Sequence, residues 1–220
     1  MPEARAELRV EGRDDKWAIV NLLIRNGVDY DRKPWPMAYP EIRETDGIDA
    51  MLEGMEVAVQ VSTGRPIGFV LDADSPLAER WAAVRDRLLA VGVDVPEALP
   101  VHGFVGRSTT YGTEVGVWLM PDNVADGNLE EFLCRLISDG DTIIGHARSA
   151  TREAQGLGAL FTESALSKAE IHAWLAWQEE PGLPYGTAVR AHYFRHDHAL
   201  VQRFVAWFCS LYGICQGGTG

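Results

Sequence analysis

The feature that most constrains the fold is a short apolar run that stops at two aspartates. The run Phe69–Leu71 is followed by Asp72 and Asp74. Ser75 is then placed to cap a helix, and Pro76 suits the first turn of that helix. A short apolar run that ends in turn residues is typical of a buried strand in a parallel sheet. Ligands of such sheets bind at the carboxyl ends of the strands, where the two aspartates are expected.

A second strand exit, near the start of the chain, carries another carboxylate. Leu8 and Val10 predict a short strand that ends at Glu11. The helix that follows has an apolar set that includes Trp17, and we expect Asp14 or Asp15 to cap it. Glu11 and Asp72 are therefore both expected at the carboxyl end of a strand, just before a helix.

The order of the elements predicts an α/β fold with a mostly parallel sheet flanked by helices. A Pro-rich loop or edge strand spans residues 34–40, a helix begins at Asp46, and the helix after Pro76 extends to Val91. Two short strands are expected at residues 101–105 and 115–120, as a candidate hairpin. Residues 1–125 are therefore interpreted as the α/β core, and residues 126–220 as a helical extension that packs as a layer on it. Trp174 and Trp177 are expected in the core.

A third strand exit places Asp122 after a predicted strand, with Glu130 in the first turn of a helix predicted over residues 129–137. Carboxylate oxygens without soft ligands favour Mg²⁺ or Mn²⁺ over zinc. The alternative is that such residues only form turns or cap helices. We prefer that interpretation for the four other acidic residues near element boundaries: Asp14, Asp15, Asp46 and Asp126.

Composition limits the classes of function. The net charge of −12 over 220 residues argues against a protein that coats nucleic acid nonspecifically. Cys134, Cys209 and Cys215 show no zinc or disulfide spacing, which favours a reducing cytoplasm. The first nine residues are too polar for a signal peptide, and no apolar run reaches membrane-spanning length. We therefore expect a cytoplasmic protein with no membrane partner.

The motifs in the first half of the chain resemble a Toprim domain. The resemblance rests on residues 10–15, on the helix, weak strand and helix that follow, and on the apolar run before Asp72 and Asp74. The whole chain, from about Leu8 to Phe208, resembles the DUF3226 family of Toprim-like bacterial proteins, which is distantly similar to OLD-type nucleases. Three further stretches fit that family, at residues 117–123, 129–133 and 175–178.

The resemblance implies roles for particular residues. Glu11 would be a general acid or base and a metal ligand, and Asp72 and Asp74 would be metal ligands. Glu130 resembles an acidic position in OLD-like nucleases, and Lys168 is similar to a basic catalytic residue there. Asp122 joins the candidate metal ligands through its strand exit. Pro76 stands where topoisomerase-type Toprim domains often carry a third aspartate, which argues against topoisomerase activity.

Three functions are compatible with these residues. The first is a Mg²⁺- or Mn²⁺-dependent, nuclease-like enzyme that cleaves or transfers phosphodiesters, with nucleic acid or a nucleotide or other phosphate compound as substrate. The second is a non-catalytic binding or regulatory module that keeps the acidic cleft. The third is a HAD-like phosphatase, because an apolar run before Asp-x-Asp also marks that class; the sequence shows no later GDxxxD signature. A homo-oligomer is compatible with all three.

Overall fold

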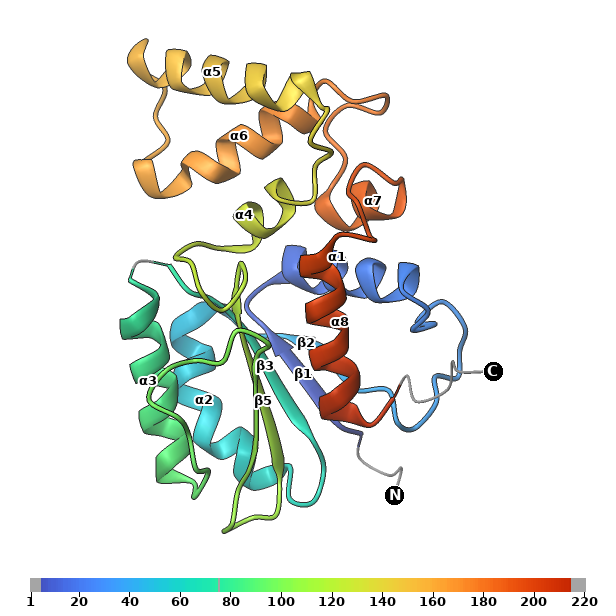
Figure 1. The fold of residues 1–220 in the computed structure, drawn as a ribbon, viewed down its shortest axis with the longest axis vertical. Coiled ribbons are helices and arrows are strands. Elements are labelled where there is room, and N and C mark those ends of the chain that lie inside the picture. The colour runs from blue at the N-terminus through green and yellow to red at the C-terminus, as the bar shows by residue number, and fades with distance from the viewer. Residues whose placement is uncertain (1–4, 75, 215–220) are drawn as a thin grey trace.

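A single five-stranded sheet runs through the protein, as seen in the computed structural model, which describes residues 5–74 and 76–214 (Figure 1). The strand order is β2-β1-β3-β5-β4. All neighbouring strands are parallel except β4, which runs antiparallel to β5. The strands are β1 (Glu7–Val10), β2 (Glu41–Glu44), β3 (Ile67–Asp72), β4 (Phe104–Arg107) and β5 (Glu114–Met120).

Helices cover both faces of this sheet (Figure 1). The helices are α1 (Arg13–Arg25), α2 (Gly47–Val61), α3 (Leu77–Ala90), α4 (Leu129–Cys134), α5 (Thr142–Gly156), α6 (Leu166–Leu175), α7 (Tyr185–Arg190) and α8 (Ala199–Tyr212), with a 3₁₀ turn η1 (Glu163–Ala165) before α6. α2 and α3 lie on one face, and α1 and α8 lie on the other. α4, α5 and α6 lie beyond the carboxyl edge of the sheet. The predicted α/β class, with a mostly parallel sheet, is confirmed.

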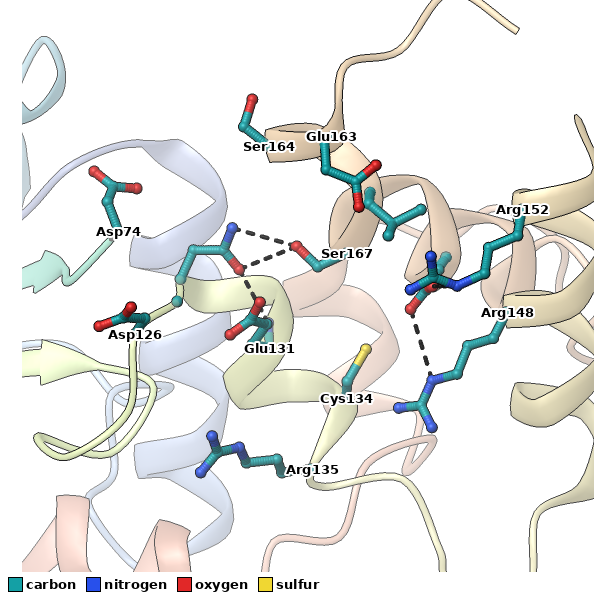
Figure 2. A pocket seen from close by; sticks show the side chains of 14 residues that line it. Asp74, Asp126, Glu131, Cys134, Arg135, Arg148, Arg152, Glu163, Ser164 and Ser167 are labelled. Carbon is teal, nitrogen blue, oxygen red and sulfur yellow. Dashed lines mark hydrogen bonds and ion pairs between the residues drawn. The ribbon is translucent and has the colours of Figure 1, made fainter. Parts of the chain in front are cut away.

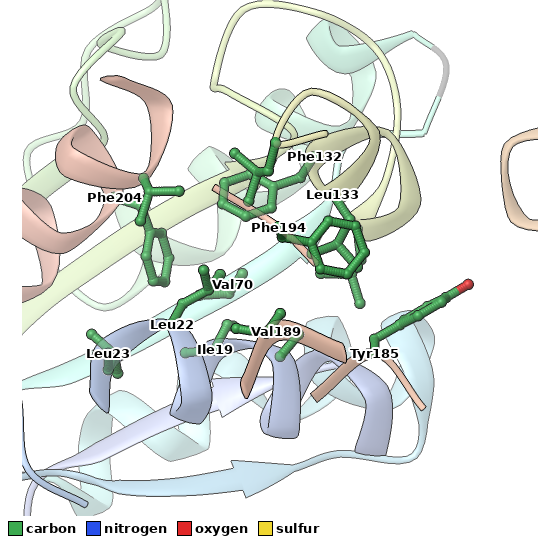
Figure 3. Close-up of a cluster of buried hydrophobic side chains, with 14 of the residues drawn as sticks. Ile19, Leu22, Leu23, Val70, Phe132, Leu133, Tyr185, Val189, Phe194 and Phe204 are labelled. Carbon is green, nitrogen blue, oxygen red and sulfur yellow. The ribbon is translucent and has the colours of Figure 1, made fainter. Parts of the chain in front are cut away.

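The alternation of side chains along the central strands creates two separate cores. Val70 on β3 and Trp118 on β5 point to the core formed by α1, α4, α6, α7 and α8. Phe69 and Val117 are their sequence neighbours, and they point to the core under α2 and α3. Figure 3 shows part of the first core, where α1 meets β3, α4 and the C-terminal helices. β3 is therefore buried on both faces, as its unbroken apolar run predicts.

The C-terminal helices complete the first core. Phe204 on α8 packs edge-to-face on Trp118 of β5, with ring centroids 5.3 Å apart. Trp207 also contacts Trp118, and its indole Nε1 donates a hydrogen bond of 3.0 Å to the carbonyl of Phe104. α7 packs so tightly on α1 that a Cβ at Gly186 would come within 2.8 Å of the Trp17 backbone. Residues 199–212 therefore share the hydrophobic core of the strands.

Replacing Phe204 with alanine should lower the free energy of unfolding by about 3–5 kcal/mol, because it leaves a cavity against Trp118 and Phe132. Chemical denaturation monitored by circular dichroism measures this change. The exposed Leu160, replaced with alanine, is the matched control and should change stability by less than about 0.5 kcal/mol. A small effect of Phe204→Ala would mean that α8 does not belong to the core.

Several predicted boundaries are wrong. Residues 34–40 form a loop, which is one of the two predicted alternatives, and β2 follows it. β4 begins at Phe104 instead of Val101, although the hairpin with β5 is confirmed. Helix α4 ends at Cys134 rather than Ile137. The N-cap of α1 is Gly12, with Asp15 completing the cap by accepting from the Gly12 N–H, and the N-cap of α3 is Pro76. The capping role predicted for Ser75 lies outside the described residues.

Two predictions about side chains also need correction. Trp174 is buried, but Trp177 is 46% exposed, because it follows the end of α6 and packs on His146 rather than on the core. Cys209 is disulfide-bonded, which the cysteine spacing does not predict, so cysteine usage no longer supports a reducing compartment. Within the described ranges, none of the helices combines the length and apolarity needed to span a bilayer.

Candidate functional site

Glu11 and Asp72 meet at the carboxyl edge of the sheet. β1 and β3 are parallel neighbours, with Arg9 opposite Phe69, so both chains leave the sheet at the same edge. The backbone N–H of Asp72 donates a hydrogen bond of 2.7 Å to Oε1 of Glu11. This hydrogen bond connects the carboxyl ends of β1 and β3, at residues that are 61 positions apart in sequence.

The carboxylate of Asp72 is held against helix α4. Its Oδ1 accepts a hydrogen bond of 3.0 Å from the backbone N–H of Leu129, the first residue of α4. Burial raises the pKa of Asp72 to about 9, and the surrounding negative charges add to this effect. These charges are carried by Glu11, Asp15, Glu130 and Asp74. Five carboxylates therefore act on one another at this edge.

Glu11 titrates near neutral pH. Burial raises its pKa to about 7, against the opposing effect of the hydrogen bond from Asp72, and the charges of Asp15 and Asp74 raise it further. A carboxyl group with this pKa is suited to take up or release a proton at neutral pH. The acid–base role that the sequence resemblance implies for Glu11 stays a prediction.

Asp15 belongs to the same cluster, although the sequence interpretation treated it as a helix cap. It does accept a hydrogen bond of 3.0 Å from the backbone N–H of Gly12, at the start of α1. Burial also raises its pKa to about 6, with the charge of Glu130 among the causes. A capping role and a site role therefore coincide. The signal available in the sequence was its place four residues after Glu11, on the first turn of the helix at that strand exit.

Asp74 is held in place by its backbone and by an arginine. Its φ of +54° is a left-handed conformation that aspartate tolerates better than most residues, and its N–H and carbonyl both bond to Gly127 at 2.9 Å. Nη2 of Arg80 lies 2.5 Å from Oδ2 of Asp74, while Nε donates to the carbonyl of Asp72 at 3.1 Å. Arg80 was not predicted from sequence; it connects the two aspartates.

Glu130 and Lys168 form a pair at the border of the cluster. Nζ of Lys168 lies 3.6 Å from Oε1 of Glu130, which is buried on α4. The hydroxyl of Tyr185 donates a hydrogen bond of 3.3 Å to the same oxygen and lies 3.2 Å from Nε2 of His172. Glu130 thus connects the acidic cluster to side chains of α6 and α7.

The structure places Asp122 apart from the cluster. Its Oδ1 accepts hydrogen bonds from the backbone N–H groups of Val124 and Ala125, and its Oδ2 pairs with Arg135 at 2.5 Å. Burial alone would raise the pKa of Asp122, but these three partners outweigh it and hold the pKa below its ordinary value. The structure thus ties Asp122 into a turn, and its geometry does not favour the metal-binding role expected from the sequence.

Replacing Asp122 with alanine should therefore destabilise the protein by about 1–2 kcal/mol at pH 7. Because the folded-state pKa of Asp122 is lowered, its contribution is present above the unfolded-state value and is lost as the pH falls through the folded-state value. The difference between wild type and Asp122→Ala should therefore become smaller in acid. Denaturant titrations at pH 7 and pH 3 measure it; a constant difference would contradict the assignment.

Two cavities open at this edge of the sheet. One, of about 690 Å³, is lined by Glu11, Asp15 and Asp72, together with residues of the loop after β2. The other, of about 740 Å³, begins at Asp74 and extends between α4, α5 and α6. Figure 2 shows the second cavity, with Arg135, Arg148 and Arg152 among the labelled side chains around it. The acidic cluster is thus accessible from two sides.

The donor chemistry of the cluster fits a hard divalent cation. All of its carboxylates offer oxygen, and those of Glu11 and Asp72 are each oriented by one backbone N–H. Within residues 5–74 and 76–214, no three His, Cys, Asp or Glu side chains are grouped in a way that could hold a metal ion. Mg²⁺ commonly takes one or two protein carboxylates and completes its shell with water and substrate phosphate, and Glu11 and Asp72 are the two carboxylates that could hold it here.

The fold and this site define an α/β protein with a cluster of carboxylates at the carboxyl edge of a mostly parallel sheet. The chain belongs to the DUF3226 family, described as a protein of unknown function, whose model matches residues 5–213. No curated protein matches the chain.

Two solved structures are similar in fold over nearly the whole chain. Both are of the C-terminal region of the Xanthomonas campestris pv. campestris OLD protein, phased with mercury or with iodine. The first has a TM-score of 0.49 and 13% identity, and the second has 0.45 and 16%. In each case 97% of this chain and 98% of the other chain are covered.

Proposed function

We propose that the protein is a metal-dependent enzyme that cleaves or transfers phosphodiesters, with Glu11 and Asp72 at its centre. The observation that carries the proposal is the hydrogen bond between Asp72 and Glu11, at the ends of β3 and β1, which gathers carboxylates, most of them partly buried, at one edge of the sheet. Carboxylates that raise one another's pKa favour a bound cation, because a cation offsets their mutual repulsion. A functional site is also where strongly perturbed pKa values concentrate.

The roles of the residues follow from their geometry. Asp72, with Glu11 or Asp74 beside it, would hold Mg²⁺ or Mn²⁺, and the ion would supply charge stabilisation for a phosphate. Glu11, whose pKa is about 7, would accept a proton from the attacking hydroxyl or water. Lys168, which lies 3.6 Å from Glu130, would orient that carboxylate and add positive charge at the border of the cluster.

The second cavity offers contacts for the phosphates of a substrate. Arg148 and Arg152 lie one turn apart on α5, and both face Glu170, at 3.6 Å and 4.0 Å. The two guanidinium groups share this one carboxylate, so around Glu170 positive charge exceeds negative charge, although four further carboxylates line the cavity. Arginine is suited to phosphate because its donors match the spacing of two phosphate oxygens. A phosphate chain that reaches Asp74 could therefore contact Arg148 or Arg152 in the same cavity, where a bound cation would offset the carboxylates.

The test is hydrolysis of bis(p-nitrophenyl) phosphate in the presence of Mn²⁺. We expect wild type to release p-nitrophenol and Asp72→Asn to lose activity by at least about 100-fold, the scale of one electrostatic group in a transition state. Glu11→Gln should lose activity to a similar extent, and the acidic limb of the pH–rate profile, where the general base becomes protonated, should change. Asp86→Asn removes an exposed carboxylate of α3 and is the matched control.

The outcomes separate the alternatives. Hydrolysis of p-nitrophenyl phosphate in preference to the diester would support a phosphatase. Metal binding at Asp72 without hydrolysis of either ester, or of single-stranded DNA, would support a non-catalytic acidic module. Equal activity of Asp72→Asn and wild type would refute the assignment of the site.

A further inference from the structure

A third cavity, of about 520 Å³, lies between α1, β2 and the Pro-rich loop. Its volume is within the usual range for small-molecule sites, which is roughly 300–1,000 Å³. Three of the side chains that line it are aromatic: Trp17, Tyr30 and Trp35. It is separate from the acidic cluster, and nothing in the proposed reaction uses it.

Trp17 is exposed where the helix pattern places a core residue. The sequence groups it with the apolar residues of α1, yet 47% of it is accessible to solvent. Its backbone is fixed by the close approach of Gly186 on α7. A large aromatic side chain that lines a cavity, on a backbone that cannot move away, offers a flat surface for stacking.

Tyr30 and Trp35, which also line the cavity, are held by hydrogen bonds. Nε1 of Trp35 donates a hydrogen bond of 2.8 Å to the carbonyl of Tyr30, and the two rings meet edge-to-face at 5.3 Å. The hydroxyl of Tyr30 donates a hydrogen bond of 3.0 Å to the carbonyl of Pro40. The aromatic wall is thus ordered by polar bonds before any ligand arrives, which reduces the entropic cost of binding.

The charges around the cavity favour an anionic ligand. The carboxylate of Asp31 accepts two hydrogen bonds of 3.0 Å from Nη1 and Nη2 of Arg190, and this bidentate pair neutralises its charge. Glu41 forms an ion pair with Arg43 at 2.7 Å. Lys33 is exposed and lies 5.0 Å from the Trp35 ring centroid, and within the described ranges it forms no ion pair with a carboxylate. It is therefore available to a phosphate.

We propose that this cavity binds a nucleotide, with its base between Trp17 and Trp35 and its phosphate at Lys33. Aromatic surfaces accept any planar base, and stacking contributes about 1–3 kcal/mol per base, or roughly 5- to 150-fold in affinity. The buried amide of Asn21 lines the same cavity, donates to the carbonyl of Trp17 at 2.8 Å, and carries an oxygen that can accept from an exocyclic amine. Such an amine is present on adenine, cytosine and guanine and absent from uracil.

The experiment is calorimetric titration of AMP, CMP, GMP and UMP into metal-free protein, with ribose 5-phosphate as a probe that lacks the base. We expect saturable binding of AMP, CMP or GMP, at least ten-fold tighter than that of ribose 5-phosphate and tighter than that of UMP. Trp17→Leu should weaken nucleotide binding by about ten-fold or more. Trp177→Leu is the matched control, because Trp177 is equally exposed, at 46% against 47%, and lies elsewhere.

Lys33→Gln provides a second variant on an exposed side chain. It should weaken binding of AMP and reduce the salt dependence of that binding, whereas the melting temperature should stay unchanged. No saturable binding of any of the four nucleotides, equal affinity for AMP and ribose 5-phosphate, or unchanged affinity in both Trp17→Leu and Lys33→Gln would overturn the proposal. Because no metal or turnover is needed, failure here leaves the phosphodiesterase test of Asp72 unaffected.

Discussion

Asp72→Asn should make the metal-free protein more stable than wild type at pH 8, by about 1–3 kcal/mol, the scale of an uncompensated buried polar or charged group. The wild-type carboxylate is buried among four others, and its pKa is raised to about 9. Asparagine keeps the oxygen that accepts from Leu129 and removes the charge. A substitution at the centre of the site is therefore expected to stabilise the fold.

The same pKa shift determines how stability depends on pH. A carboxyl group with a raised folded-state pKa binds its proton more tightly in the folded protein than in the unfolded chain. The free energy of unfolding should therefore decrease as the pH rises from about 4, the unfolded-state value, to about 9. Glu11 contributes in the same direction up to about 7. Asp72→Asn should flatten this dependence, most clearly above pH 7.

Denaturant titrations in the presence of a chelator, at pH 5 and pH 8, measure both effects. Asp86→Asn removes a solvated charge and should leave the pH dependence as in wild type. If Asp72→Asn were less stable than wild type at pH 8, Asp72 would be satisfied within the protein, and its place in a repulsive cluster would be wrong.

Divalent metal should reverse the order of stability. Binding to the folded state adds RT ln(1 + [L]/Kd), so Mn²⁺ at about 100 times its Kd should stabilise wild type by about 2.7 kcal/mol. Asp72→Asn should lose most of this increment, because an amide oxygen is a poorer ligand than a carboxylate. Asp74→Asn should also lose part of it, while its left-handed backbone is tolerated by asparagine.

Thermal melting with and without Mn²⁺ is sufficient to measure these changes. Asp122→Ala is an informative control, since it is destabilised in both conditions but should keep the full metal-induced increment. Equal metal-induced shifts for wild type, Asp72→Asn and Asp74→Asn would show that the metal binds elsewhere.

The sequence predicts the strands and the acidic edge because both depend on local patterns. The apolar run before Asp72 can only be buried as a strand, and a parallel neighbour necessarily brings Glu11 to the same edge. Local patterns do not distinguish Asp15, which lies in the carboxylate cluster, from Asp122, which is bonded within a turn. Both are aspartates beside an element boundary, and only the path of the chain places one next to Glu130 and the other next to Arg135.

Local sequence patterns also do not reveal which residues contact each other across the fold. Arg80 lies on α3, six residues after Asp74, and nothing in its helix distinguishes it from the other arginines there. The exposure of Trp17 follows from the packing of α7 on α1, between segments about 170 residues apart. Such contacts depend on the whole fold, whereas apolar spacing reports only which face of a helix can be buried.

We expect a divalent cation to bind beside the hydrogen bond between Asp72 and Glu11, at the carboxyl ends of β3 and β1. Crystals soaked in Mn²⁺ test this most directly. An anomalous difference map recorded at the manganese edge should show a peak in contact with Asp72 and with Glu11 or Asp74, and no such peak in crystals of Asp72→Asn. A peak confined to Asp122 and its turn, or no peak at any carboxylate of the cluster at saturating Mn²⁺, would contradict the account.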